Sequence, residues 1–126
     1  MTGLGPWPLL LVAVGGALGS VLRHLVSMQA AAHLGAGFPW GTLAVNVSGS
    51  AAIGLLGGFG VGGDRRVLLV TGLLGGFTTF SAFSLETGLL WERGGWWPAA
   101  AYVAASLLLG LLAFALCLWA GRRLWP

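Results

Sequence analysis

Four long stretches without a charged side chain divide this chain: residues 1–22, 24–63, 67–85 and 94–121. A helix that spans a membrane needs about 20 mainly apolar residues, which each of these stretches can supply. Only 7% of the residues are charged and 57% are hydrophobic, whereas a soluble domain needs far more charge to cover its surface. The pattern therefore excludes a soluble domain, nucleic-acid binders included, and predicts an all-α membrane protein with four spans.

The predicted spans form a single membrane domain over residues 1–126. Its helices are expected over residues 8–28, 39–60, 66–91 and 97–120. A signal peptide is the alternative interpretation of the first span, but no positively charged residue precedes that span, as a signal peptide would require.

The distribution of arginines gives a weak indication of orientation. With four spans, both termini share one side of the membrane with four arginines, and two arginines belong to the other side. These are Arg65, Arg66, Arg122 and Arg123 against Arg23 and Arg93. The excess favours termini in the cytoplasm. It is small enough to permit insertion in both orientations, or one fixed orientation beside an oppositely oriented relative.

Small residues recur at four-residue spacing in the predicted helices, and this spacing lets helix backbones approach closely in lipid. The pairs include Gly15 with Gly19, Gly54 with Gly58, Gly72 with Gly76, and Ser106 with Gly110. A tightly packed bundle explains most of them. Because four thin helices are too few to enclose a pore, we expect the chain to associate with a second subunit.

The segment from Gly75 to Ser84 lies near the middle of the third predicted helix, close to the centre of the membrane. Its two adjacent glycines and its Thr–Thr pair make a poor helix interior. A break there would free carbonyl groups, which lipid cannot satisfy and which must then line a site or be buried in protein. Carbonyl oxygens suit hard cations, and broken transporter helices bind Na⁺ with them. The segment thus favours an alkali-ion site and a packed Gly–Thr helix about equally.

Uncharged polar and aromatic side chains near this segment could form the wall of an ion path. Phe80 and Phe83 share one helix face, where they provide either apolar packing or ring edges that contact a small anion. Asn46 lies deep in the second span and needs a partner, which could be another helix or an anion. Other hydroxyl groups at helical spacing in the second and fourth spans belong to Thr42, Ser50, Tyr102 and Ser106. Donors without charge suit a passage that dehydrates an ion without trapping it.

Two charged residues lie within the predicted spans. Arg23 either extends to the membrane interface or forms an attractive mouth for anions. Glu86 is the only acid inside a span, so it is a functional candidate or a cap for the Thr hydroxyls of the break. The single cysteine, Cys117, excludes a disulfide within the chain and a multi-cysteine metal centre. Because no nucleophile–base pair or phosphate-binding loop is present, we expect no enzyme.

Three blocks of sequence follow one another in a characteristic order. They are Gly15–Gly19 with Arg23, then Gly41–Asn46 with Gly49, and finally Gly75–Ser81 with Phe83, Ser84 and Glu86. Together with the length and the four spans, these blocks make nearly the whole chain similar to the small fluoride channels of the Fluc/CrcB family. The third block is the specific one.

The resemblance implies a fluoride-selective channel that exports fluoride passively across the cell membrane and so reduces fluoride toxicity. It also implies an antiparallel dimer, either a homodimer or a heterodimer with a related chain, in contact with membrane lipid. The third helix would be broken near the membrane midplane, and a structural Na⁺ that is not transported would lie at this break, at the dimer centre, on the carbonyls of Gly75 and Thr78 of both subunits. Arg23 matches an arginine near the vestibule, and Glu86 matches an acid beside Thr79. The implied pore residues are Phe80, Phe83, Asn46, Thr42, Ser81, Tyr102 and Ser106.

The chain departs from the family pattern at His24, Ala82 and Gly110, where a Tyr, a Thr and a Ser are common. Two other functions are compatible with the sequence. A small multidrug exporter is also a short four-span dimer, but its proton coupling needs a membrane-embedded acid, for which Glu86 is the one candidate. The chain could also be a non-conducting partner subunit of a heterodimeric channel.

Overall fold

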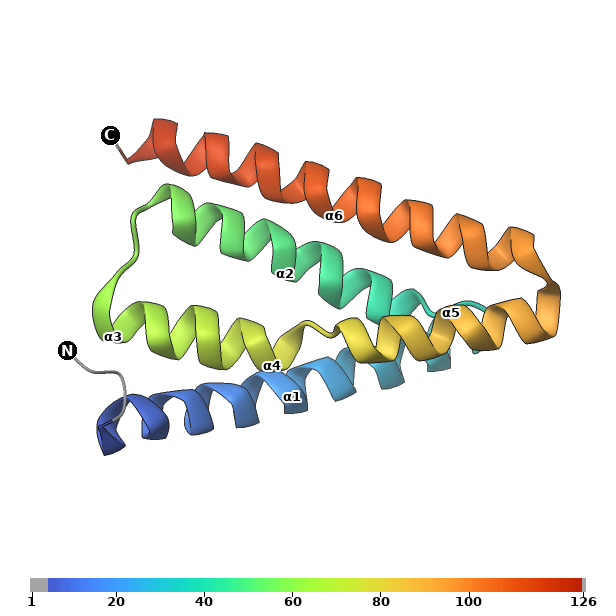
Figure 1. Cartoon of the computed structure of the whole chain (residues 1–126), viewed down its shortest axis with the longest axis horizontal. Helices are drawn as coiled ribbons and strands as arrows, with labels where there is room; N and C mark the ends of the chain where they lie inside the picture. The colour runs from blue at the N-terminus through green and yellow to red at the C-terminus, as the bar shows by residue number, and fades with distance from the viewer. Residues whose placement is uncertain (1–4, 126) are drawn as a thin grey trace.

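The computed structural model describes residues 5–125 and is helical over almost all of them (Figure 1). Its elements are α1 (Pro6–Leu34), α2 (Trp40–Gly58), α3 (Gly63–Arg66), the π-helix η1 (Val67–Leu74), α4 (Gly75–Phe77), α5 (Phe80–Gly94) and α6 (Trp96–Leu124). The four elements from α3 to α5 make up the third of four helical segments that are long and apolar enough to cross a membrane. The prediction of an all-α protein with four spans is therefore confirmed.

The first helix extends further than the sequence pattern indicated. It begins at Pro6, whose missing N–H would have no partner in a first helical turn, and continues through an Ala-rich stretch to Leu34, beyond residue 28. It stops at Gly35, which adopts a φ of +83° and donates its N–H to the Ala31 carbonyl at 3.0 Å. The connection before α2 is correspondingly shorter than predicted.

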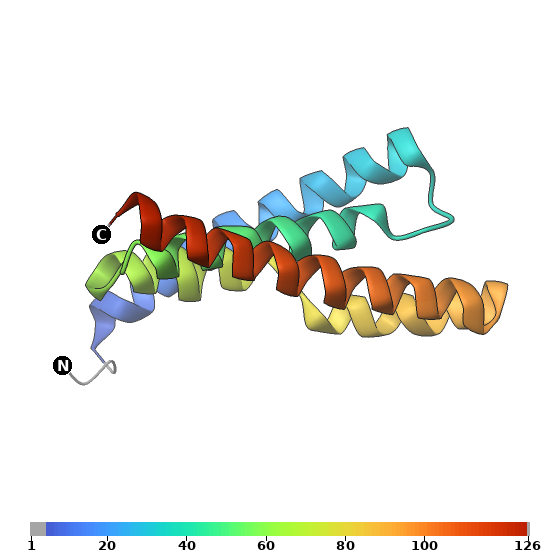
Figure 2. The same cartoon turned by 90° about the horizontal axis from the view of Figure 1, so that it is seen from above.

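The two ends of the bundle differ in how the helices are spaced. The start of α1, the end of α6 and the α2–α3 connection lie at one end (Figure 1). Toward the other end, the α1–α2 pair diverges from the α5–α6 pair (Figure 2). α2 packs along α6, and α1 packs against η1 and α4, whereas α5 packs chiefly against α6. The third span therefore changes its packing partner where α4 gives way to α5.

Glycines allow main chains to touch at two helix–helix interfaces. Between α1 and η1, a Cβ at Gly15 would lie 2.5 Å from the Leu68 carbonyl oxygen. Between α2 and α6, a Cβ at Gly58 would lie 2.7 Å from the Cα of Gly121. The bundle interpretation of these glycines is confirmed, since no larger residue fits. Gly110 is different, because a Cβ there would meet only the Ser50 hydroxyl, at 3.6 Å.

The π-helix η1 had no counterpart in the sequence pattern. Its hydrogen bonds run from i to i+5, a geometry that is rare and often found at functional sites. It lies directly before α4 and carries Gly72, where an added Cβ would come within 3.1 Å of the Gly15 Cα. Close packing on α1 thus holds the chain that leads into the break.

We expect Gly19→Ala to destabilise the protein. A Cβ at Gly19 would collide with the carbonyl oxygen of Leu73 and lie 2.8 Å from the nitrogen of Phe77. Because both neighbours are main-chain atoms, α1 and η1 would have to separate, at a cost of about 1–3 kcal/mol of the free energy of unfolding. Thermal unfolding of the purified protein in detergent measures this loss.

Gly16→Ala is the matched control, because a Cβ at Gly16 would meet only the Gly72 carbonyl oxygen, at 3.9 Å. Equal midpoints for the two variants would contradict main-chain packing between α1 and η1.

Candidate functional site

The third span is broken between α4 and α5, as predicted. Thr78 (φ −88°, ψ 156°) and Thr79 (φ −152°, ψ 125°) both adopt extended backbone, and a thin connection replaces the helix there (Figure 1). The break follows Gly75 and Gly76 directly, so the weak helix formers of this segment coincide with the interruption. Main-chain groups that a continuous helix would pair are left to find other partners.

The amide of Asn46 replaces the missing helical partners of Thr79. Its Oδ1 accepts a hydrogen bond from the Thr79 N–H at 2.8 Å, and its Nδ2 donates to the Thr79 carbonyl at 2.9 Å. The Thr79 hydroxyl in turn accepts from the Ala82 N–H at 3.2 Å and so caps α5. Of the two amide hydrogens of Asn46, one is used in this way and the other is available for a further acceptor.

Arg23 donates from Nε to the Gly76 carbonyl at 3.0 Å. It follows Gly15 and Gly19 at four-residue spacing, so it continues the face of α1 that packs on η1 and α4. The expectation that Arg23 extends to the membrane interface is therefore wrong. Because α1 continues to Leu34, Arg23 lies well inside the helix, where a main-chain acceptor at the break is within reach.

The carbonyl oxygens of Gly75 and Thr78 remain free. Among residues 5–125, no hydrogen bond reaches either oxygen, whereas Gly76 and Thr79 have partners in Arg23 and Asn46. Both residues line a cavity of about 350 Å³ between α2 and the broken span. In the described part of the chain, no group of three or more His, Cys, Asp or Glu residues could hold a metal. No charged side chain of the described residues lines this cavity, so the oxygens near it belong to main-chain carbonyls and to uncharged side chains.

Four of the predicted pore residues meet in a neighbouring cavity of about 210 Å³, between α2, α5 and α6. They are Asn46, Phe80, Phe83 and Ser106, and Ser50 and Gly110 also line this cavity. The rings of Phe80 and Phe83 lie 5.6 Å apart and are tilted by 45°, and Phe80 is 76% exposed. The Ser106 hydroxyl is buried and has no hydrogen-bond partner among the described residues. A buried polar atom without a protein partner calls for another partner, such as a water molecule or a bound ion.

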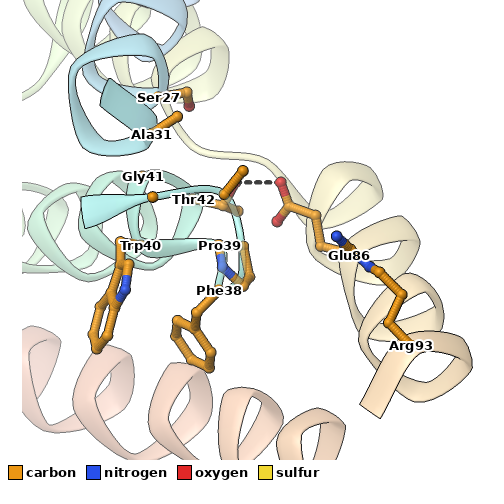
Figure 3. Close-up of a pocket in the computed structure, with 11 residues that line it drawn as sticks. Ser27, Ala31, Phe38, Pro39, Trp40, Gly41, Thr42, Glu86 and Arg93 are labelled. Carbon is orange, nitrogen blue, oxygen red and sulfur yellow. Dashed lines mark hydrogen bonds between the residues drawn. The ribbon is translucent and has the colours of Figure 1, made fainter. Parts of the chain in front are cut away.

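Thr42, Glu86 and Tyr102 form a separate polar cluster. The hydroxyls of Thr42 and Tyr102 each donate to one carboxylate oxygen of Glu86, both at 2.8 Å (Figure 3 shows the Thr42 contact). Thr42 is 5% exposed and Tyr102 is fully buried, so neither lines the cavity of Phe80 and Ser106. Phe83 connects the two sites, because its ring lies 5.2 Å from that of Tyr102.

The expectation that Glu86 caps the Thr hydroxyls of the break needs correction, and the role of Ser81 in the pore stays a prediction. Glu86 does not hydrogen-bond to Thr79, because it lies well along α5, where its carboxylate reaches Thr42 and Tyr102 instead. Ser81 is exposed and lies 3.4 Å from the Thr79 hydroxyl, outside the cavity that Phe80 lines. The helical spacing of the sequence could not predict the partners of Glu86 or the position of Ser81, because the third span changes direction at the break.

We expect Asn46→Ala to destabilise the break, because it leaves the N–H and the carbonyl of Thr79 without partners. Each unsatisfied buried group costs about 1–3 kcal/mol. Thermal unfolding in detergent should show a clear loss for this variant. Ser48→Ala on the same helix is the control, since the exposed Ser48 hydroxyl bonds only to main-chain carbonyls of its own helix. An Asn46 variant as stable as this control would contradict the stabilising role of the amide.

Comparison with known proteins places these features in a family. A family model described as CrcB-like protein, Camphor Resistance (CrcB), matches residues 10–121. A protein of Chelativorans sp. named fluoride-specific ion channel FluC is 52% identical over 121 residues, covering 92% of this chain and 97% of its own. Proteins with the same name in Hyphomonas neptunium (49% identical; 91% and 95% covered) and Mesorhizobium japonicum (48%; 92% and 97%) are similar over comparable lengths. The chain belongs to the CrcB family.

Proposed function

We propose that this chain forms a fluoride-selective channel, which lets fluoride leave the cell passively and so reduces its toxicity. The relatives at about half identity are named fluoride-specific ion channels, and none of those names describes an enzyme. The observation that carries the proposal is the cavity shared by Phe80, Phe83, Asn46 and the unpartnered Ser106 hydroxyl. It offers donors and ring edges but no charged side chain.

These groups can replace the water of a small anion without trapping it. The Ser106 hydroxyl and the second amide hydrogen of Asn46 are neutral donors, and the edges of aromatic rings are electropositive. A site without fixed charge binds an ion weakly enough for it to leave. A negative-inside potential, worth about 2.3 kcal/mol per charge per 100 mV, drives an anion outward through such a path.

The path continues in this proposal past Phe83 to the hydroxyls of Thr42 and Tyr102. Phe83 contacts Tyr102, and the hydroxyls of Thr42 and Tyr102 each donate their one proton to Glu86. These two residues would therefore shape the path and hold the Glu86 carboxylate in place, rather than donate to the ion. Ser81 would line the path only beyond Phe80, on the exposed side of α5. Arg23 acts through the main chain, because its bond to Gly76 holds the segment that precedes the break.

A second subunit completes the site. Phe80 is 76% exposed, and its cavity opens to the outside of the bundle together with the cavity that contains the free carbonyls. Lipid cannot satisfy exposed main-chain oxygens, so another protein surface must cover this face. We infer that the cover is a second copy or a close relative, in the antiparallel arrangement that the family resemblance implies.

The carbonyls of Gly75 and Thr78 fit a structural Na⁺ that both subunits share. They are hard oxygen ligands without competing hydrogen bonds, and they lie on the face that the second subunit would cover. Two carbonyl oxygens from one chain are too few to coordinate an alkali ion. If two subunits share the ion, each would contribute two carbonyl oxygens, which would explain why these oxygens have no hydrogen-bond partner within one chain. When bound, the ion would stabilise the broken segments against each other.

Efflux from liposomes that contain this chain alone tests the function. We expect rapid release of fluoride and no measurable release of chloride, because chloride is too large to regain its hydration energy from the same donors. Equal release of both anions would contradict selectivity. Absence of any release would favour a non-conducting partner subunit, and proton-coupled uptake of a lipophilic cation would favour a multidrug exporter.

Phe80→Ile sharpens the test in the same assay, since it keeps an apolar side chain but removes the ring edge. We expect fluoride release to fall about tenfold, as for the loss of ~1.4 kcal/mol of interaction. Leu85→Ile is the matched control, because Leu85 is exposed on α5 and lines neither cavity. An unchanged rate in the Phe80 variant would remove this ring from the path.

Replacement of Na⁺ by choline on both sides of the membrane tests the ion site. We expect fluoride release to stop and the protein to lose its dimeric mass in light scattering. With Na⁺ present on both sides, the rate should not depend on its gradient, because the ion is not transported. Full activity and a stable dimer in choline would contradict the Na⁺ site, and a dependence on the gradient would indicate coupled transport.

A further inference from the structure

A third cavity lies at the end of the bundle where the two helix pairs diverge. It has a volume of about 210 Å³ and is enclosed by α1, the α1–α2 connection, the start of α2, and α5. Figure 3 shows Thr42 of α2 and Glu86 of α5 facing each other, with the Arg93 side chain extending along α5 toward Glu86. Because the hairpin connections mark this end, the cavity is an opening toward one membrane surface.

Glu86 creates an electrostatic problem for an anion at this opening. Its two carboxylate oxygens accept hydrogen bonds from Thr42 and Tyr102, which stabilise the charge but do not cancel it. A negative charge that lines an entrance lowers the local concentration of anions, and a low-dielectric surrounding strengthens that effect. An anion path through this end therefore needs a compensating positive charge.

Arg93 is placed to supply that charge. It lies two helical turns after Glu86, on the same face of α5, and both residues line the cavity. Its Nε donates to the Leu89 carbonyl at 3.3 Å, which directs the side chain back along α5 toward Glu86. Glu92, its neighbour in sequence, does not line the cavity.

The guanidinium group of Arg93 forms no ion pair with a carboxylate of the described residues. No nitrogen of a basic side chain lies within 4.0 Å of a carboxylate oxygen anywhere in residues 5–125, so Arg93 and Glu86 share the cavity without forming an ion pair. An arginine that faces a solvent-filled opening without an ion-pair partner acts on ions that enter, over about a Debye length. Its effect is therefore on the rate at which anions arrive.

We propose that Arg93 offsets the charge of Glu86 at this opening and thereby sets the rate at which fluoride enters the channel from this end. The inference rests on the proposed function, and it adds an attracting residue outside the cavity of Phe80 and Ser106. The charge of Arg93 attracts fluoride and chloride alike, because both carry one negative charge. Arg93 therefore affects the conduction rate and not the discrimination between the two anions.

The test compares initial fluoride efflux for wild type, Arg93→Gln and Arg65→Gln, in sodium gluconate of about 10 mM and about 1 M. Arg65 is exposed at the opposite end of the bundle and lines none of the three cavities described. We expect Arg93→Gln to lower the rate about tenfold at low salt, within the range of electrostatic steering. At high salt the difference should nearly vanish, because the Debye length falls from about 30 Å to 3 Å.

Arg93→Lys separates charge from packing, because it keeps the positive charge but not the planar guanidinium. We expect it to retain most of the wild-type rate at low salt. A Lys variant as slow as the Gln variant, or a Gln variant as fast as wild type, would overturn the role of the Arg93 charge while leaving the proposed function intact. Wild-type protein without fluoride efflux would overturn the proposed function and, with it, this inference.

Discussion

The architecture depends on one constraint, which is that main-chain polar groups inside a membrane must have partners. The break at Thr78 and Thr79 removes helical partners in the middle of the third span. The side-chain amide of Asn46 hydrogen-bonds to the N–H and the carbonyl of Thr79, and Arg23 donates a hydrogen bond to the Gly76 carbonyl. What remains is a pair of carbonyls without hydrogen-bond partners, so the same constraint that stabilises the break leaves the groups on which the proposed cation site and second subunit rest.

The break also decides how the span packs on both sides of it. Before the break, glycines bring η1 and α4 into main-chain contact with α1. After it, α5 leaves α1 and packs chiefly on α6, so that the two helix pairs diverge (Figure 2). This change of partner turns Phe80 toward the outside of the bundle and opens the cavity that Glu86 and Arg93 line. A continuous third helix could not produce both features.

Polar chemistry is divided between two regions with different physical roles. Around Asn46 and Ser106 the donors are neutral, which suits close contact with a partly dehydrated ion. Around Glu86 and Arg93 the groups are charged and face an open cavity, where charge acts over a longer range on ions that still carry their water. Phe83 and Tyr102 form the boundary, with their rings 5.2 Å apart. In the proposed channel, charged groups would attract the anion at the opening and neutral donors would contact it further inside.

The sequence by itself determined the number of spans, the position of the break and the close packing at Gly15 and Gly58, because charge spacing, helix propensity and side-chain size are local properties. The family resemblance of the sequence implied one pore set, of which Asn46, Phe80, Phe83 and Ser106 line the same cavity. Only the tertiary structure decided that Asn46 pairs with Thr79, that Arg23 turns inward to Gly76, and that Glu86 joins Thr42 and Tyr102 rather than Thr79. Each of these contacts joins residues on different helices or across the break. Their distances depend on how far α1 continues and on the direction that α5 takes, which no local pattern encodes.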